Sequence, residues 1–138
     1  MQSIFVDTDV CLDLLSGRKP FAASAERLFS YADKGYLTIY VSSLTFANLD
    51  YLLKSAYKIR DSRQILAKFK TLVTTLPVDD KIVSLSLTSD FLDFEDAIQH
   101  YTAIENDIPI LVTRNLKDYQ HSMIQVMNTE MFLSGFVS

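Results

Sequence analysis

Acidic side chains that could hold a divalent cation stand at three separate places in the sequence. Asp7 follows the first short apolar run, Asp96 lies at the start of a late helical segment, and Asp118 follows an apolar run near the C-terminal end. If the fold gathers these carboxylates, they repel one another strongly unless a cation neutralises them or some take up protons. Oxygen ligands without neighbouring His or Cys favour Mg²⁺ or Mn²⁺ over Zn²⁺. The residue types therefore indicate metal-dependent chemistry.

The elements that must position these side chains alternate between strand and helix. Apolar runs typical of strands lie at residues 3–6, 36–41, 75–78, 108–112 and 124–127, with helical segments between them. Parallel strands need crossover connections, and right-handed crossovers place helices on the faces of the sheet. We therefore predict an α/β fold of three α/β/α layers around a mainly parallel sheet, as a single domain over residues 1–138. Functional residues are then expected at the carboxyl ends of the strands.

Two of the expected helices carry candidate site residues. The first begins at Ser42 or Ser43, either of which can cap it. Its predicted inner stripe consists of Leu44, Ala47, Asn48, Tyr51 and Leu52, so a polar amide lies in an apolar face. The later helix has acidic residues in its first turn, where the helix dipole favours negative charge. Its predicted apolar face consists of Phe94, Ala97, Ile98, Tyr101 and Ile104.

The composition and net charge of the chain exclude several classes of function. The chain has 138 residues, of which 49% are hydrophobic, and this is enough for a core without disulfides or a structural metal. The single Cys11 cannot form an internal disulfide, and residues 1–10 lack the pattern of a signal peptide, so we expect a cytoplasmic protein with no membrane span. The net charge of −4 argues against binding nucleic acid through a broad basic surface. A nuclease that uses a metal remains compatible, because its clustered carboxylates lower the net charge.

Four segments of the sequence together resemble the PIN-domain pattern. They are residues 5–10 (FVDTDV), 41–48 (VSSLTFAN), 93–97 (DFEDA) and 112–119 (VTRNLKDY). Their order, spacing and total length resemble those of PIN-domain nucleases, which include the VapC toxins of bacterial toxin–antitoxin pairs. The resemblance implies a parallel sheet flanked by helices and metal-dependent cleavage of RNA. We accordingly expect an RNA substrate, an antitoxin protein as partner, and a homodimer.

The resemblance also implies roles for individual residues. By position, Asp7 and Asp96 match two metal-binding acids of the pattern, and Thr113 matches its threonine. Asn48 stands where the family usually has Glu, and Asn115 stands where many members have Asp. An amide oxygen can bind a metal, but it contributes no charge and cannot act as a base. These two positions therefore lower the expected affinity for metal.

The charge missing at these positions is expected to come from Asp118. It lies three residues after Asn115, and positions three apart are neighbours on a helix. The predicted metal ligands are therefore Asp7, Asp96 and Asp118, and Asn48 completes the predicted catalytic set. Residues that would position water or phosphate are Thr113, Arg114 and Asn115, while Asp9 would hydrogen-bond the turn that presents Asp7.

Two other functions compete with the nuclease hypothesis. Residues 7–11 (DTDVC) after a strand resemble the nucleophile loop of a haloacid-dehalogenase-type phosphatase, although that motif has Thr or Val where Cys11 stands. The second alternative is a PIN-like domain that has lost its metal and serves as an RNA- or protein-binding module. Binding of Mn²⁺ separates this module from a working nuclease.

Overall fold

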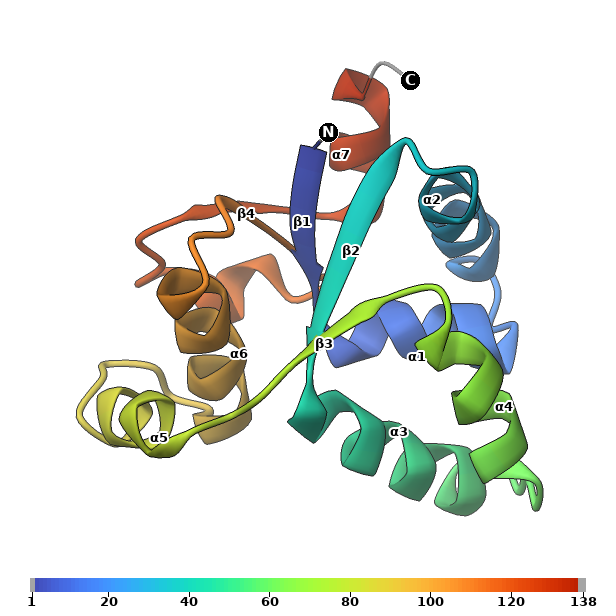
Figure 1. Ribbon diagram of the computed structural model, residues 1–138, viewed down its shortest axis with the longest axis horizontal. Helices are drawn as coiled ribbons and strands as arrows, with labels where there is room; N and C mark the ends of the chain where they lie inside the picture. Colours follow the sequence, from blue (N-terminus) through green and yellow to red (C-terminus); the bar gives the residue numbers. More distant parts are fainter. Residues whose placement is uncertain (1, 137–138) are drawn as a thin grey trace.

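The predicted strands form one sheet with helices on both faces (Figure 1). The computed structural model describes residues 2–136. The strands are β1 (Gln2–Val6), β2 (Leu37–Ser42), β3 (Thr74–Leu76), β4 (Ile110–Val112) and β5 (Gln125–Met127). They are arranged in the order β3-β2-β1-β4-β5, and every neighbouring pair is parallel. The predicted three-layer α/β/α fold with a parallel central sheet is therefore confirmed.

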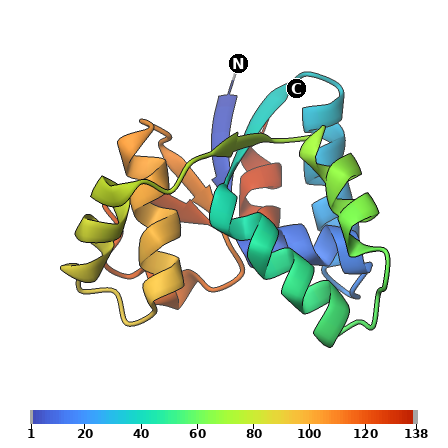
Figure 2. The same ribbon diagram turned by 60° about the horizontal axis from the view of Figure 1, so that its bottom comes forward.

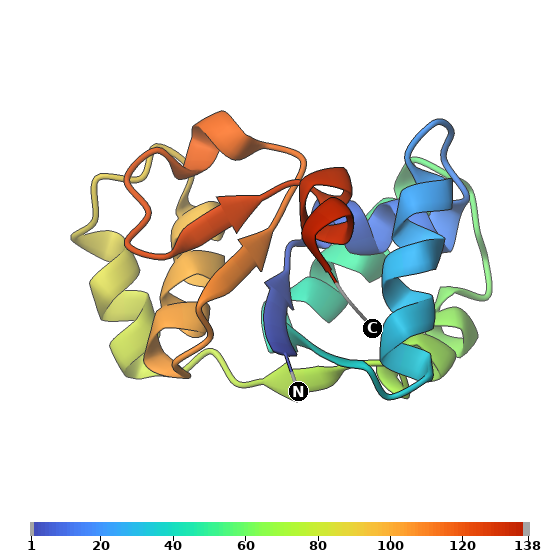
Figure 3. The same cartoon turned by 90° about the horizontal axis from the view of Figure 1, so that it is seen from above.

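Helices cover the two faces unequally. They are α1 (Thr8–Ser16), α2 (Ala22–Asp33), α3 (Ser43–Ser55), α4 (Ser62–Lys70), α5 (Asp80–Leu87), α6 (Phe94–Glu105) and α7 (Thr129–Gly135), with a 3₁₀ helix η1 (Leu116–Tyr119). Figures 1 and 2 show α5 and α6 on one side of the strands and α1 to α4 on the other. In Figure 3, α7 lies between the strands and α2, where its Phe132 joins the larger core cluster. Within residues 2–136, no helix is both long and apolar enough to cross a membrane.

The alternating side chains of β1 join the sheet to both helical layers. Ile4 and Val6 are fully buried in the cluster that contains core residues of α2, α3 and α4. Phe5 is buried in a second cluster with Leu111 of β4 and Ala103 of α6. Successive residues of a strand point to opposite faces, so one short apolar run supplies both cores.

The order in which successive strands join the sheet reverses at β1. The chain first adds β2 and β3 on one side of β1, and later adds β4 and β5 on the other. The carboxyl ends of β1 and β4 are held together because the Asp7 backbone N–H donates to the carbonyl oxygen of Val112 at 2.9 Å. In open parallel sheets, ligands bind at such a switch point. Asp7 and Thr113 are the first residues beyond the two strand ends.

The helix that begins after β2 starts as predicted but buries a different face. The Ser42 hydroxyl oxygen accepts the backbone N–H of Thr45 at 3.3 Å and so caps α3. The predicted inner stripe is wrong as a core face, because Tyr51 is 69% exposed and the buried residues of α3 are Thr45, Leu49 and Leu53. The physical reason is the position of α3 beside the strand ends, where the predicted stripe borders a pocket. Asn48, Tyr51 and Leu52 all line that pocket.

The apolar face predicted for the late helix is also partly wrong. Ala97 and Ile98 are buried in α6 as expected, but Phe94 is 46% exposed. The helix instead buries three polar residues, Gln99, His100 and Thr102. Each makes at least one hydrogen bond, although Nδ1 of His100 is buried without a partner among the described residues. Gln99 is the one of the three that hydrogen-bonds at a strand end, through Ser42 of β2.

Candidate active site

Asp7 is held at the end of β1 by three hydrogen-bond donors. Its Oδ1 accepts the backbone N–H of Thr8 at 2.8 Å, which caps α1. Its Oδ2 accepts the hydroxyl groups of Thr113 at 2.9 Å and Tyr119 at 3.0 Å. The side chain is buried, and burial raises the pKa of Asp7 although these hydrogen bonds oppose the rise. The structure thus presents a desolvated carboxylate in one fixed orientation.

Asp96 lies on the other side of the Tyr119 hydroxyl. Its Oδ1 is 3.4 Å from Tyr119 Oη, so both predicted acids surround one oxygen atom. Burial, followed by the negative charges of Asp7, Asp93 and Asp118, raises the pKa of Asp96 to about 7. The structure therefore brings Asp7 and Asp96 together, and their electrostatics disfavour two ionised carboxylates in the absence of a cation.

Asp9 connects the start of α1 to the segment after β4. Its Oδ2 accepts the backbone N–H of Arg114 at 3.1 Å and the Asn115 side-chain amide at 3.2 Å. The Thr113 hydroxyl lies 3.3 Å from the same oxygen and is closer to Asp7, at 2.9 Å. Within the described part of the chain, its buried Oδ1 has no hydrogen-bond partner. Burial, followed by the charge of Asp7, raises the pKa of Asp9 to about 7. A buried carboxylate oxygen with no donor is available to another partner.

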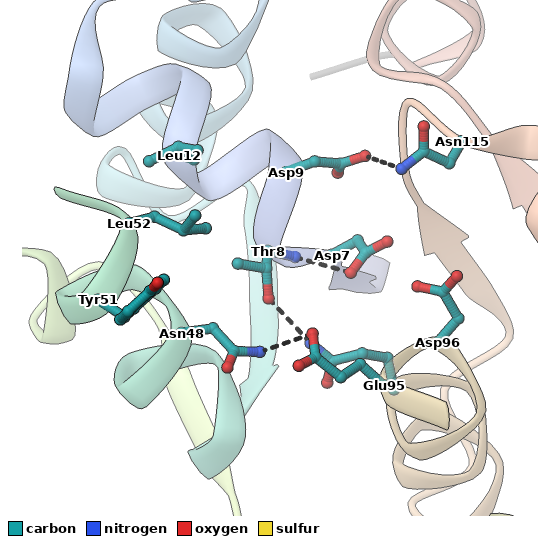
Figure 4. Close-up of a pocket in the computed structure, with 11 residues that line it drawn as sticks. Asp7, Thr8, Asp9, Leu12, Asn48, Tyr51, Leu52, Glu95, Asp96 and Asn115 are labelled. Carbon is teal, nitrogen blue, oxygen red and sulfur yellow. Dashed lines mark hydrogen bonds between the residues drawn. The ribbon is translucent and has the colours of Figure 1, made fainter. Parts of the chain in front are cut away.

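Asn48 and Glu95 form the opposite wall of the same pocket (Figure 4). The Asn48 side-chain amide donates to Glu95 Oε2 at 3.2 Å, which joins α3 to α6. The pocket has a volume of about 380 Å³, and Asp7, Asp9, Asp96 and Asn115 also line it. Sequence reasoning missed Glu95 because the helix dipole explained two of the three acids at the start of α6, and the family pattern selected Asp96.

Gln99 is a second residue that sequence reasoning missed. It is 2% exposed, and its Oε1 accepts the Ser42 hydroxyl at 2.6 Å. Its amide donates to Thr45 Oγ1 at 3.0 Å and to Thr8 Oγ1 at 3.1 Å. These bonds tie the end of β2 and the starts of α1 and α3 to α6. Its spacing of three residues from Asp96 was the available signal, because such residues share a helix face.

Asp118 lies outside the pocket that Asp7 and Asp96 share. It is exposed on η1 and lines a separate hollow with Asp93 and Lys117. The next residue, Tyr119, is buried with its ring in the smaller core cluster. Because Tyr119 points inward, its neighbour points outward. Asp118 acts on Asp96 through its charge, which raises the pKa of Asp96.

The Arg114 side chain is also directed away from the two acids. Its Nε is 2.8 Å from Oδ2 of Asp13, and its guanidinium lies 4.0 Å from the centre of the Phe21 ring. It lines an adjoining pocket of about 290 Å³. Asp13 is 2% exposed and also pairs with Arg18, so the guanidinium of Arg114 neutralises a buried charge. Only the backbone N–H of Arg114 reaches Asp9.

The oxygen atoms around Tyr119 fit a hard divalent cation. Within residues 2–136, no group of three or more His, Cys, Asp or Glu side chains is close enough to hold a metal ion by itself. Mg²⁺ does not need such a group, because it usually binds one or two carboxylates and completes its shell with water and substrate phosphates. Asp7 and Asp96 offer two carboxylates with raised pKa values, and Asp9 offers an unpartnered oxygen nearby. A cation would offset the desolvation and the repulsion that raise these pKa values.

The raised pKa values predict how the metal-free protein responds to pH. Asp9 and Asp96 have pKa values of about 7 when folded, against the ordinary aspartate value of 3.8 that we take for the unfolded chain. Between these two pH values the folded protein binds more protons than the unfolded chain. The stability that Asp9 and Asp96 contribute to the folded protein is therefore fully present below pH 3.8 and is lost as pH rises through 7. In EDTA, the unfolding temperature of the wild type should fall between about pH 4 and 7 relative to the Asp9→Asn, Asp96→Asn double variant. Parallel curves for the two proteins would contradict these protonation states.

A sequence profile of the PIN domain matches residues 3–117 of the chain. This match covers most of the sequence and includes Asp7, Asn48, Asp96 and Thr113. The chain belongs to the PIN-domain family. Family membership leaves the haloacid-dehalogenase alternative without support. No curated protein matches the chain in sequence.

Solved structures of VapC-type proteins share the fold. DNA-bound VapBC from Salmonella typhimurium has a TM-score of 0.72 and 16% identity, covering 94% of this chain and 99% of that one. VapBC2 from Rickettsia felis, bound to a promoter DNA fragment, has a TM-score of 0.68 and 17% identity, with coverages of 92% and 98%. The Mycobacterium tuberculosis toxin VapC20, which cleaves the sarcin–ricin loop, has a TM-score of 0.66 and 18% identity, with coverages of 97% and 96%. At these identities the likeness concerns the fold alone.

Proposed function

We propose that this chain is a Mg²⁺- or Mn²⁺-dependent endoribonuclease and the toxin of a toxin–antitoxin pair. The observation that carries the proposal is the pair of desolvated carboxylates, Asp7 and Asp96, around the Tyr119 hydroxyl at the switch point of the sheet. Membership of the PIN-domain family, which includes nucleases, supports the same conclusion. Their burial and raised pKa values make it unfavourable for both acids to be ionised, and a bound cation would offset this cost.

In this proposal the chain's own residues hold and orient the reacting groups. Asp7 and Asp96 would hold the cation, with the Thr113 hydroxyl fixing the orientation of Asp7. A bound Mg²⁺ or Mn²⁺ would supply an activated water and neutralise the charge that develops on the phosphate. Asp9 and Asn115, which are hydrogen-bonded to each other, would orient water or phosphate at the pocket edge.

The carboxylate of Glu95 on α6 would compensate for the negative charge that Asn48 on α3 does not supply. Asn48 carries no charge, but its side chain is hydrogen-bonded to Glu95, which brings a carboxylate to the place where the early helix lacks one. We therefore propose that Glu95 adds negative charge to the site from α6. Asp118 would contribute at longer range, since its charge already raises the pKa of Asp96.

The remaining surroundings of the site are consistent with a strand of RNA. The exposed Tyr51 lines the pocket and offers a ring on which a base could stack. Four basic residues follow it near the end of α3 and the start of α4 and are candidates for backbone contacts: Lys54, Lys58, Arg60 and Arg63. We further propose a cytoplasmic, single-domain protein over residues 1–138 that forms a homodimer and binds an antitoxin.

The experiment that tests this function is cleavage of defined RNAs. A panel of structured RNAs, including a sarcin–ricin stem-loop, would be incubated with the purified chain in Mg²⁺, Mn²⁺ or EDTA. We expect internal cleavage at discrete positions with either metal and none in EDTA, mapped by primer extension. Intact RNA throughout the panel at millimolar Mn²⁺ would contradict the proposal.

A binding module without catalysis is the second candidate. The amides at Asn48 and Asn115 favour it, because each removes a formal charge from the site. The donors that already occupy Asp7 favour it too. Isothermal titration with Mn²⁺ separates the two candidates, because only the nuclease requires the metal. RNA binding without Mn²⁺ binding would identify the module.

A further inference from the structure

The Tyr119 hydroxyl occupies the space between the two carboxylates on which the proposed function rests. Its Oη is 3.0 Å from Asp7 Oδ2 and 3.4 Å from Asp96 Oδ1, so these carboxylate oxygens are separated by no more than the sum of the two distances. The side chain of Tyr119 is 3% exposed. A cation shared by Oδ2 of Asp7 and Oδ1 of Asp96 would have to bind in the region where this hydroxyl now lies.

The hydrogen bonds of Asp7 leave little room for an additional partner on that side. Each carboxylate oxygen has about two lone-pair positions, and Oδ2 of Asp7 already accepts both Thr113 and Tyr119. A cation that binds Oδ2 must therefore replace one of these two hydroxyl donors. The Tyr119 hydroxyl is the donor that also contacts Asp96, so it is the one in the way of a shared cation.

A phenol only partly replaces a cation at this place. It has one proton, which can be donated to Asp7 or to Asp96 but not to both at once. The shorter distance favours donation to Asp7, and Asp96 then faces a phenol oxygen. A divalent cation would instead attract both carboxylates. The hydroxyl thus satisfies one acid at a time, while the metal would satisfy both.

The ring of Tyr119 is held independently of its hydroxyl. It belongs to the smaller core cluster with Phe5 and Leu111. It also lies edge-to-face against Phe91, with 5.7 Å between the ring centroids. Because these contacts involve only the ring, phenylalanine can preserve them. The change Tyr119→Phe therefore removes the hydroxyl without opening a cavity in the core.

We propose that the Tyr119 hydroxyl is a built-in competitor of the divalent cation. In the metal-free protein it donates to Asp7 and keeps the acid pair in place, and metal binding requires that this donor be displaced. Tyr119 is on this view a positioning residue whose hydroxyl weakens metal affinity. The inference deepens the proposed nuclease function, because it concerns the same site and presupposes that the site binds a metal.

The test compares Mn²⁺ binding by the wild type, Tyr119→Phe and the matched control Tyr36→Phe. Tyr36 is 52% exposed and does not line the site pocket. A net hydrogen bond to a charged group corresponds to about a tenfold change in affinity or more. We therefore expect isothermal titration to give a Kd for Mn²⁺ that is about tenfold lower for Tyr119→Phe than for the other two proteins. In EDTA, Tyr119→Phe should unfold at a lower temperature than Tyr36→Phe, because only the former loses a buried hydrogen bond.

Each outcome of the titration bears on a different statement. Tighter binding by Tyr119→Phe than by the wild type supports both the competition and the proposed metal site. Binding by this variant alone supports the competition but contradicts a metal-dependent activity of the wild type. Equal or weaker binding by Tyr119→Phe overturns the competition but leaves the nuclease proposal intact, because the wild type still binds metal. Absence of Mn²⁺ binding by all three proteins overturns both statements.

Discussion

Asp7→Asn is expected to reduce metal-dependent RNA cleavage by at least about a hundredfold while the protein stays folded. Asparagine has nearly the same shape and can still accept the Thr8 backbone N–H that caps α1. It removes the negative charge that would bind the cation. The charge it removes is buried, and burial disfavours the ionised form of Asp7. The initial rate of cleavage at saturating Mn²⁺ measures the effect.

Unfolding curves and a matched variant separate this chemical effect from loss of structure. Asp33→Asn makes the same substitution at an exposed position at the end of α2 and should cleave at the wild-type rate. Asp7→Asn in EDTA should unfold at a temperature no lower than that of the wild type, because a desolvated charge has been removed. Equal cleavage by Asp7→Asn and wild type would refute the role assigned to Asp7.

The second large effect is expected on the affinity for Mn²⁺. Loss of the Asp96 charge should weaken binding much more than loss of the Asp118 charge. Asp96→Asn should weaken Mn²⁺ binding by about a hundredfold or more, because two unit charges about 4 Å apart interact by about 4 kcal/mol near a protein surface. Asp118→Asn should weaken it by less than about tenfold, because exposed charges at longer range are screened by solvent and salt. Asp118 is exposed and lines a different hollow, whereas Asp96 lines the pocket with Asp7.

Isothermal titration of the two variants at moderate ionic strength measures this difference. Raising the salt concentration should reduce the effect of Asp118→Asn further, while the effect of Asp96→Asn should change less, because partly buried charges are less screened. A loss for Asp118→Asn as large as that for Asp96→Asn would mean that η1 rearranges and that Asp118 binds the metal directly. That result would favour the ligand set that the sequence alone indicated.

Much of the fold could be predicted from local sequence patterns. Each predicted strand exists, and the residues expected at the strand ends, Asp7 and Thr113, hydrogen-bond to each other. These predictions succeeded because strand ends in a parallel sheet meet at one edge whatever the details of packing. The strand expected at residues 108–112 is shorter in the structure, where β4 spans Ile110–Val112. Pro109 lacks a backbone N–H, which explains why regular pairing begins only after it.

The inner details of the site depend on tertiary contacts that no local pattern contains. Asp118 and Tyr119 are adjacent, and only the packing of the Tyr119 ring against Phe91 and the core determines which of them points inward. Gln99 was overlooked because a polar residue is not expected in the buried face of a helix, although here it joins α6 to Ser42. The hydroxyl between two acids became visible only in three dimensions. Sequence reasoning therefore assigned roles to Asp7, Asp96 and Thr113 but not to Tyr119 or Gln99.

Anomalous diffraction from crystals soaked in Mn²⁺ most directly tests whether Asp7 and Asp96 share a cation. Data collected at the manganese absorption edge would locate the metal without reference to any assumed chemistry. We expect a peak about 2 Å from a carboxylate oxygen of each acid, with the Tyr119 hydroxyl displaced from Asp7. A well-ordered site with no peak there, or a peak bound by other carboxylates only, would contradict the central claim that this acid pair is a metal centre.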